Sequence, residues 1–209
     1  VYPSLRTAQT EVLTVKPKKS KEEIATLALA IANGSQSAGA LTLEEMAYAA
    51  ANNPSLEEKQ AIYEAAAGKN DTWVIHNNLG AVHLAMAMQS SGREQRNHIN
   101  TAKNHFNISN QKNANVEASA NLGMTLAMEG NLWGAHAELS KAAGMNPNNE
   151  VRQGINGAKG SVEIKVGRYD LAIGSLNGAS SSSFDQFNKG LVKLLRKDYR
   201  NAQATLESV

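Results

Sequence analysis

The sequence contains no cysteine, which excludes disulfide bonds and thiolate chemistry but does not fix the cellular compartment. Proline is also rare, with 4 in 209 residues, and aromatic residues make up 5% of the chain. A core must therefore be built from Ala, Leu, Ile and Met, a composition that suits closely packed helices. These absences predict an all-α protein.

A large charge of one sign is missing too, because 21 Lys and Arg stand against 19 Asp and Glu, for a net charge of +2. Proteins that bind nucleic acid or membrane surfaces electrostatically show a one-sided excess. The longest apolar run, Ile24–Ala32, counts nine residues including Thr26. A membrane-spanning helix needs roughly 20. We therefore expect no nucleic-acid partner and no transmembrane segment.

The first 20 residues differ in character from the rest of the chain. Val12–Val15 has the composition of a strand. Pro17 lies in the lysine-rich stretch Lys16–Lys21 and ends any regular element there. We predict an extended segment or linker over residues 1–20, with a basic docking patch as the alternative. The chain begins with Val1 and shows no signal peptide, so we expect a processed protein or a piece of a longer one.

Three capping signals predict helices within residues 21–70. Each signal places a glutamate three residues after a serine or threonine, an arrangement that satisfies free amides at a helix N-terminus. The pairs are Ser20 with Glu23, Thr42 with Glu45, and Ser55 with Glu58. We expect the three helices to end near Ala32, Asn52 and Ala67.

Residues 71–209 repeat small and apolar residues at fixed intervals. A glycine is followed by an alanine twelve positions later and by a leucine four positions after that, in Gly123–Ala135–Leu139, Gly160–Ala172–Leu176 and Gly190–Ala202–Leu206. Small residues let two helices cross closely, and the leucine fills the space beside the crossing. Gly130 and Gly167 fall in the turns between helices. We predict repeats over about 72–113, 114–150, 151–182 and 183–209.

This pattern resembles the tetratricopeptide repeat (TPR), a helix–turn–helix unit of about 34 residues. The resemblance implies a right-handed superhelical solenoid of α-α hairpins. The sequence departs from the pattern at an insertion around Ser90–Asn97, where we expect longer helices or a loop. In the helices of residues 42–67, a candidate degenerate repeat, Glu58 occupies the place of the small alanine. The array ends without a polar capping helix, so we expect further protein beyond Val209.

The histidines are the main candidates for metal binding, and their spacing argues against it. His76 and His83 lie seven residues apart, as do His98 and His105. Seven residues span roughly 10 Å of helix, whereas one zinc ion takes ligands three or four residues apart. We assign packing or surface roles to these rings and to His136, and we predict no metal site.

No other motif indicates catalysis or a cofactor. Gly154, Gly157 and Gly160 lack the Lys-Ser/Thr pair and the preceding strand of a phosphate-binding loop. We expect them to form a smooth helix face for close packing. No serine lies in a GxSxG context, and the acidic pairs fall in first turns of helices, where they complement the helix dipole. We therefore predict that the protein is not an enzyme and uses no cofactor.

In TPR arrays the first helices of successive units line a concave groove, so the resemblance assigns a binding surface. The Lys and Arg of the family's carboxylate-clamp subtype are missing at the matching positions. Asn78, Asn121 and Asn188 recur at one register position and could pair with the backbone of an extended peptide; the alternative is that asparagine merely suits this position. Methionines in the groove would adapt to varied partners. The candidate groove residues are Asn77, Asn78, Leu84, Asn121, Met124, Met128, Lys165, Phe184, Phe187, Asn188 and Leu191.

We therefore predict a protein-interaction scaffold that binds an extended peptide or a protein partner in this groove. Two alternatives stay open: a structural spacer or oligomerisation module of a larger envelope protein and, more remotely, an enzyme. The strings Tyr2–Arg6, Leu43–Met46 and Asn77–Val82 resemble the repeat region of secreted Gram-negative envelope proteins. Such proteins often carry an OmpA-like, peptidoglycan-binding module. This resemblance implies a periplasmic or envelope location, with the cytoplasm as alternative, and makes other domains of the same chain candidate partners.

Overall fold

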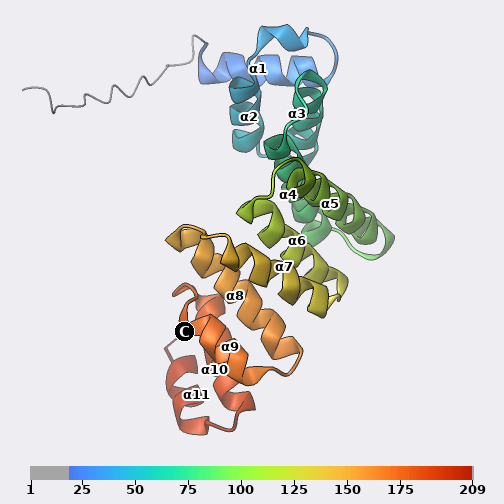
Figure 1. The fold of residues 1–209 in the computed structure, drawn as a ribbon. Helices are drawn as coiled ribbons and strands as arrows, with labels where there is room; N and C mark the ends of the chain where they lie inside the picture. The colour runs from blue at the N-terminus through green and yellow to red at the C-terminus, as the bar shows by residue number, and fades with distance from the viewer. Residues whose placement is uncertain (1–18, 209) are drawn as a thin grey trace, which may run out of the picture.

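The computed structural model describes residues 19–208, which form eleven α-helices, one short 3-10 helix and no strand (Figure 1). The prediction of an extended segment over residues 1–20 falls outside the described residues except for residues 19 and 20, and the strand-like Val12–Val15 lies outside them entirely. The elements are α1 (Lys21–Ala32), η2 (Ala38–Ala40), α2 (Leu43–Asn52), α3 (Leu56–Lys69), α4 (Trp73–Gln89), α5 (Gly92–Lys112), α6 (Val116–Glu129), α7 (Leu132–Gly144), α8 (Asn149–Lys165), α9 (Tyr169–Asn177), α10 (Ser183–Leu195) and α11 (Tyr199–Leu206).

The caps expected at the N-terminal helices are present. In α1 and α2, the capping hydroxyl accepts a hydrogen bond from the backbone N–H of the glutamate, whose carboxylate accepts one from the backbone N–H of the capping residue. Ser55 accepts from the Glu58 N–H at 3.2 Å, but the Glu58 carboxylate accepts from the Asn53 side chain instead. The third cap is therefore one-sided. All three helices are confirmed, with α3 extending to Lys69.

From α4 onward, consecutive helices pair, and each predicted glycine faces its predicted leucine. A Cβ atom at Gly123 would lie 2.7 Å from Leu139 Cγ, too close for any real side chain. At Gly160 and Gly190 the corresponding distances, to the Cγ of Leu176 and a methyl of Leu206, are 2.5 Å. The crossings therefore require glycine, as the spacing predicted. Of the glycine run in α8, Gly157 and Gly160 pack closely, whereas Gly154 is exposed with open space around it.

The insertion around Ser90–Asn97 lengthens helices and adds no loop. Helix α4 has 17 residues and α5 has 21, and only Ser90 and Ser91 separate them. Gly92 begins α5 with a φ of +62°, a conformation that glycine adopts without strain. In this hairpin the close contact joins Gly80 to the ring of Phe106.

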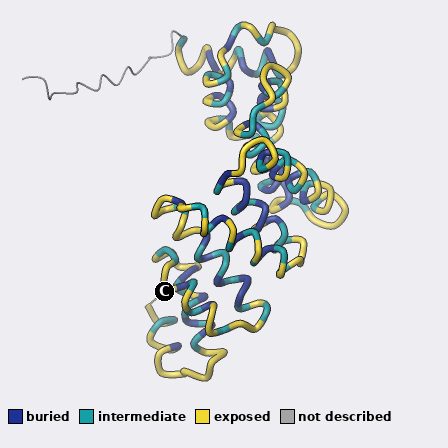
Figure 2. The backbone as a smooth tube through the Cα atoms, viewed as in Figure 1, coloured by how far each residue is buried: buried dark blue, intermediate teal, exposed yellow. Residues whose placement is uncertain are grey.

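The buried residues form a chain of small cores along the solenoid (Figure 2). The largest core joins α1, α2, α3 and α4 and contains Ile24, Met46, Ile62 and Leu79. The following cores are smaller, and each includes residues of successive helix pairs. Each pair is therefore stabilised mainly by its neighbours, as in other repeat arrays. No helix in the described part of the chain combines the length and hydropathy needed to cross a bilayer.

Candidate functional site

An apolar groove of about 520 Å³ runs across four first helices of the hairpins, α4, α6, α8 and α10. Its lining includes Met88 of α4, Met124 and Met128 of α6, Lys165 at the end of α8 and Phe184 of α10. The rest of the lining is Ala127, Leu139, Ala158, Ser161 and Val162. Four of the predicted site residues, Met124, Met128, Lys165 and Phe184, are thus brought together.

The helical register explains this lining. Met124 and Met128 lie four residues apart and so share one face of α6. Helix α8 packs beside α6 with small residues, Ala158 and Ser161, which leave the groove open above them. Phe184 lies in the first turn of α10, where 65% of its surface is exposed. The lining therefore combines small residues of α8 with flexible thioethers and one aromatic ring.

The polar groups of the groove are few. The Ser161 hydroxyl donates to the Gly157 carbonyl at 2.9 Å and accepts from the Asn188 amide at 3.0 Å, so its hydrogen bonds are satisfied. Within residues 19–208, Lys165 has neither a hydrogen-bond partner nor an ion pair for its ammonium group. The site can therefore take apolar side chains together with one carboxylate near Lys165.

The three recurring asparagines each reach back to the preceding helix pair. The Asn121 amide donates to the Asn77 side chain at 3.3 Å, and Asn188 donates to Ser161. Asn78 lies beside the hydroxyl of Tyr63 in α3, and burial raises the pKa of that hydroxyl. Pairing with a peptide backbone would compete with these contacts. The pairing of these three asparagines with the backbone of an extended peptide stays a prediction.

The other candidate residues lie outside this lining. Leu84 is 5% exposed and packs in the core with Ala102 and Phe106, so a partner cannot touch it unless the helices move. Phe187 and Leu191 lie farther along α10; Phe187 is 49% exposed. Phe187 extends the exposed apolar surface of α10 beyond the groove, whereas Leu191 is half-buried.

Sequence reasoning missed Met88. This residue lies near the end of α4, where the sequence left a loop as an alternative to a longer helix. The apolar composition of Trp73–Gln89, continuous to its end, was the available signal.

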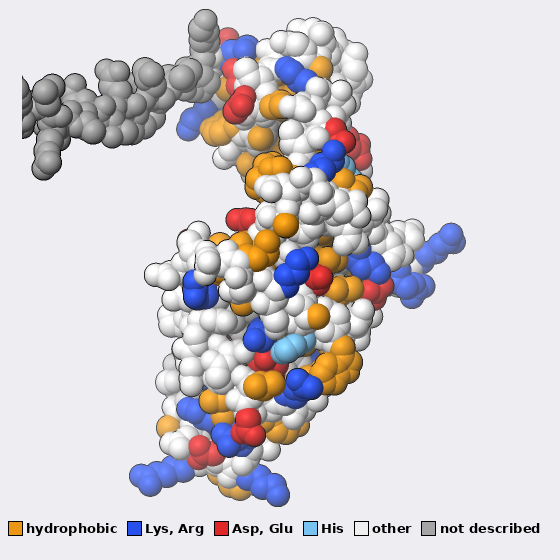
Figure 3. Space-filling model, viewed as in Figure 1, with side chains coloured by type: hydrophobic (Ala, Val, Ile, Leu, Met, Phe, Trp, Pro, Cys, Tyr) orange, Lys and Arg blue, Asp and Glu red, His pale blue; other side chains and the backbone are white. Residues whose placement is uncertain are grey.

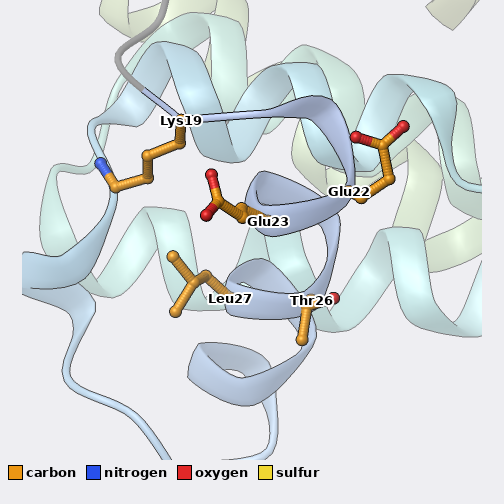
Figure 4. A pocket seen from close by; sticks show the side chains of 5 residues that line it. All are labelled: Lys19, Glu22, Glu23, Thr26 and Leu27. Carbon is orange, nitrogen blue, oxygen red and sulfur yellow. The ribbon is translucent and has the colours of Figure 1, made fainter.

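A second hollow, of about 610 Å³, lies at the start of α1 and has a different character (Figure 4). It is lined by Lys19, Glu22, Glu23, Thr26 and Leu27. Glu23 completes the α1 cap, and Lys19 donates to Glu45 of α2 at 3.2 Å. Its charged groups thus serve the helix start and the α1–α2 contact. Elsewhere on the face shown in Figure 3, charges of both signs are interspersed among apolar patches.

Comparison with known proteins identifies the fold. No family profile matches the chain, and no curated protein does either. Among solved structures, the APC/C hetero-tetramer Cut9-Hcn1 matches with a TM-score of 0.69 at 17% identity, over 89% of this chain and 36% of that one. TTC0263, a thermophilic TPR protein in Thermus thermophilus, matches with a TM-score of 0.61 at 15% identity, over 88% of this chain and 100% of that one.

The chain has the fold of TPR proteins. The structure of a human IFIT1 dimer with PPP-AAAA also matches, with a TM-score of 0.57 at 18% identity, over 90% of this chain and 54% of that one. The all-α solenoid expected from the sequence is confirmed. The chain spans 36% of the Cut9-Hcn1 chain and about half of IFIT1. At these identities the likeness to TPR proteins establishes the fold alone.

Proposed function

We propose that the groove between α4, α6, α8 and α10 binds an apolar segment of a protein partner. The observation that carries this proposal is the lining itself: three methionines and a phenylalanine around a hollow of about 520 Å³. Such pockets take large side chains and bury most of their surface. Methionine adapts its shape to different occupants, so the groove suits a family of related segments.

The positive charge of Lys165 indicates which kind of residue a partner would place beside the groove. Lys165 lines the groove and is exposed. An acidic residue or a terminal carboxylate beside the apolar side chains would pair with it. A polyanion such as nucleic acid would need several cations along its path, and the lining offers one.

A peptide-display selection tests this function. We expect the wild-type protein to enrich segments with a large apolar residue close to an acidic one. Met124→Ser/Met128→Ser should lose binding of the enriched peptides by at least tenfold. Trp133→Ser provides the control, because Trp133 is exposed on α7 outside the groove. If the methionine double variant and Trp133→Ser bind the peptides equally well, the binding site lies on another face.

The spacer or oligomerisation role is the second candidate, and the exposed apolar side chains of α10 favour it. Phe187 and Leu194 are both exposed beyond the groove. Sedimentation of the purified chain separates the two functions. A stable dimer that dissociates on Phe187→Ser, together with an empty peptide selection, would favour oligomerisation.

The envelope location also stays a proposal, which fractionation of the native cells tests.

A further inference from the structure

Four histidines form a continuous ladder between α4 and α5. Because both pairs are spaced by seven residues, the antiparallel helices bring His76 against His105 and His83 against His98. The facing Nδ1 atoms are 2.9 Å apart in the first pair and 3.1 Å apart in the second. The rings of His83 and His105 stack between the pairs, with centroids 5.8 Å apart and planes within 7°. The described residues hold no group of three or more His, Asp or Glu that could bind a metal ion.

The hydrogen bonds dictate where the protons lie in the first pair. The Nε2 atom of His76 lies 2.6 Å from a carboxylate oxygen of Asp71, which only accepts hydrogen bonds when ionised. A neutral His76 therefore carries its proton on Nε2, and its Nδ1 accepts. The Nδ1 atom of His105 must then donate. The second pair likewise needs one donating and one accepting Nδ1.

This arrangement limits how many protons the ladder can take up. Each pair tolerates one added proton, since one Nδ1–H still faces one bare Nδ1. A second proton in the same pair places two N–H donors against each other, and the hydrogen bond is lost. The unfolded chain has no such limit, so it can bind up to two more protons than the folded ladder.

Some charged groups around the rings favour protonation of the ladder, and others offset that effect. Asp71 before α4 and Glu64 of α3 favour a charged ladder, whereas Lys112 of α5 pairs with Asp71 at 2.8 Å and offsets its charge. Helix α6, which also packs on the hairpin, presents Glu129, and this carboxylate is paired with Lys103 of α5.

The pKa values of the rings agree with the geometry. Burial is the largest cause of a lowered pKa at His83, and burial and the His76 charge lower the pKa of His105 to about 4. One ring of each pair thus has a lowered pKa.

We propose that this histidine ladder is a proton-sensitive lock that holds the α4–α5 hairpin closed at neutral pH and releases it under acid conditions. Opening the hairpin displaces α4, which carries Met88 of the groove and the Asn77 contact to α6. Acidification therefore couples to the shape of the concave surface. The lock depends only on the hairpin and stands whatever the groove binds.

Urea unfolding at several pH values tests the lock. Trp133→Phe leaves Trp73, at the start of α4, as the one fluorescent tryptophan. In this background, we expect the folding equilibrium constant to fall at least roughly tenfold per pH unit between about 6.5 and 4.5. His98→Asn/His105→Asn keeps a side-chain amide near each Nδ1 position but leaves one titrating ring per pair. The slope of the logarithm of this equilibrium constant against pH should then fall by at least one. Such a fall corresponds to one proton fewer taken up on unfolding.

His136→Gln is the matched control, because it removes a histidine ring outside the ladder while keeping a donor for Glu163. This variant should keep the wild-type steepness. If the double variant keeps it as well, the ladder is not the lock. Should the double variant fail to fold, nitrogen NMR of the wild type decides at pH 8. A proton on His105 Nδ1 supports the proposal, and a proton on its Nε2 overturns it.

Discussion

The α4–α5 and α8–α9 hairpins make the same close helix crossing with different residues. In both, a glycine of the first helix admits a large side chain of the second: Phe106 against Gly80, and Leu176 against Gly160. The second helix has 21 residues in α5 and only 9 in α9. Helix α5 also carries two rings of the histidine ladder, and one of them, His105, directly precedes Phe106 at the crossing. Hairpins in a repeat array can differ in this way because each contacts only its neighbours.

The crossing therefore sets the fold, and positions of the hairpin that do not fill the crossing, such as His98 and His105, are free for other uses.

Removing the large residue at each crossing should have the greatest effect. Phe106→Ala empties a site where the ring is fully buried, and we expect a loss of about 4 kcal/mol in the free energy of unfolding. Leu176→Ala should cost about 3 kcal/mol for the same reason. Urea denaturation followed by circular dichroism measures both. A cost below about 1 kcal/mol at either site would mean that the crossing does not hold its hairpin.

The same substitution at two glycines of α8 should have opposite signs. Gly160→Ala forces a methyl group against Leu176 and should cost about 1–3 kcal/mol. Gly154→Ala meets open space on the exposed face of the helix. It should stabilise the protein by up to about 1 kcal/mol, because alanine is the better helix former. Thermal unfolding of the two variants side by side provides the test, and equal effects would refute the crossing at Gly160.

Acid should destabilise the α4–α5 hairpin more than the α8–α9 hairpin. The pKa of His105 lies at about 4 in the folded chain, below its ordinary value of 6.5. The unfolded state therefore binds more protons between these values, and stability is complete above about pH 6.5 and falls toward pH 4. His105 alone accounts for a loss on the order of 2 kcal/mol at pH 4.5. Hydrogen exchange should show α4 and α5 losing protection before α8 and α9, and simultaneous loss would contradict a local lock.

Helix caps provide the smallest and most local comparison. The Thr42 hydroxyl accepts from the Glu45 N–H at 3.1 Å, so Thr42→Ala should cost about 1 kcal/mol. Ser91 precedes α5 without a side-chain cap bond, and Ser91→Ala should change stability by less than about 0.5 kcal/mol. Thermal unfolding measures both. A larger loss at Ser91 would show that the α4–α5 turn depends on that hydroxyl.

The fold could be predicted because its determinants are periodic along the chain. Gly123, Ala135 and Leu139 repeat at fixed spacing, and that spacing is set by the crossing of two helices. The caps at Ser20 and Thr42 are local and could be predicted for the same reason.

The site could be predicted only in part, because its lining combines residues from five helices. Met124 and Met128 share a face of one helix, so their exposure on one side followed from spacing. Met88 depended on how far α4 continues. The histidine pairs depended on the register between two antiparallel helices, which the spacing along each helix does not report alone. The equal seven-residue spacing was the available signal.

Site-specific photo-crosslinking in native extract can show whether a protein partner contacts the groove between α4, α6, α8 and α10. A benzophenone side chain would replace Phe184 in the groove or Trp133 on α7, both of which are largely exposed. Our account predicts a discrete covalent adduct with a protein from position 184 and none of the same mass from position 133. Adducts from position 133 alone, or equal adducts from both positions, would contradict it.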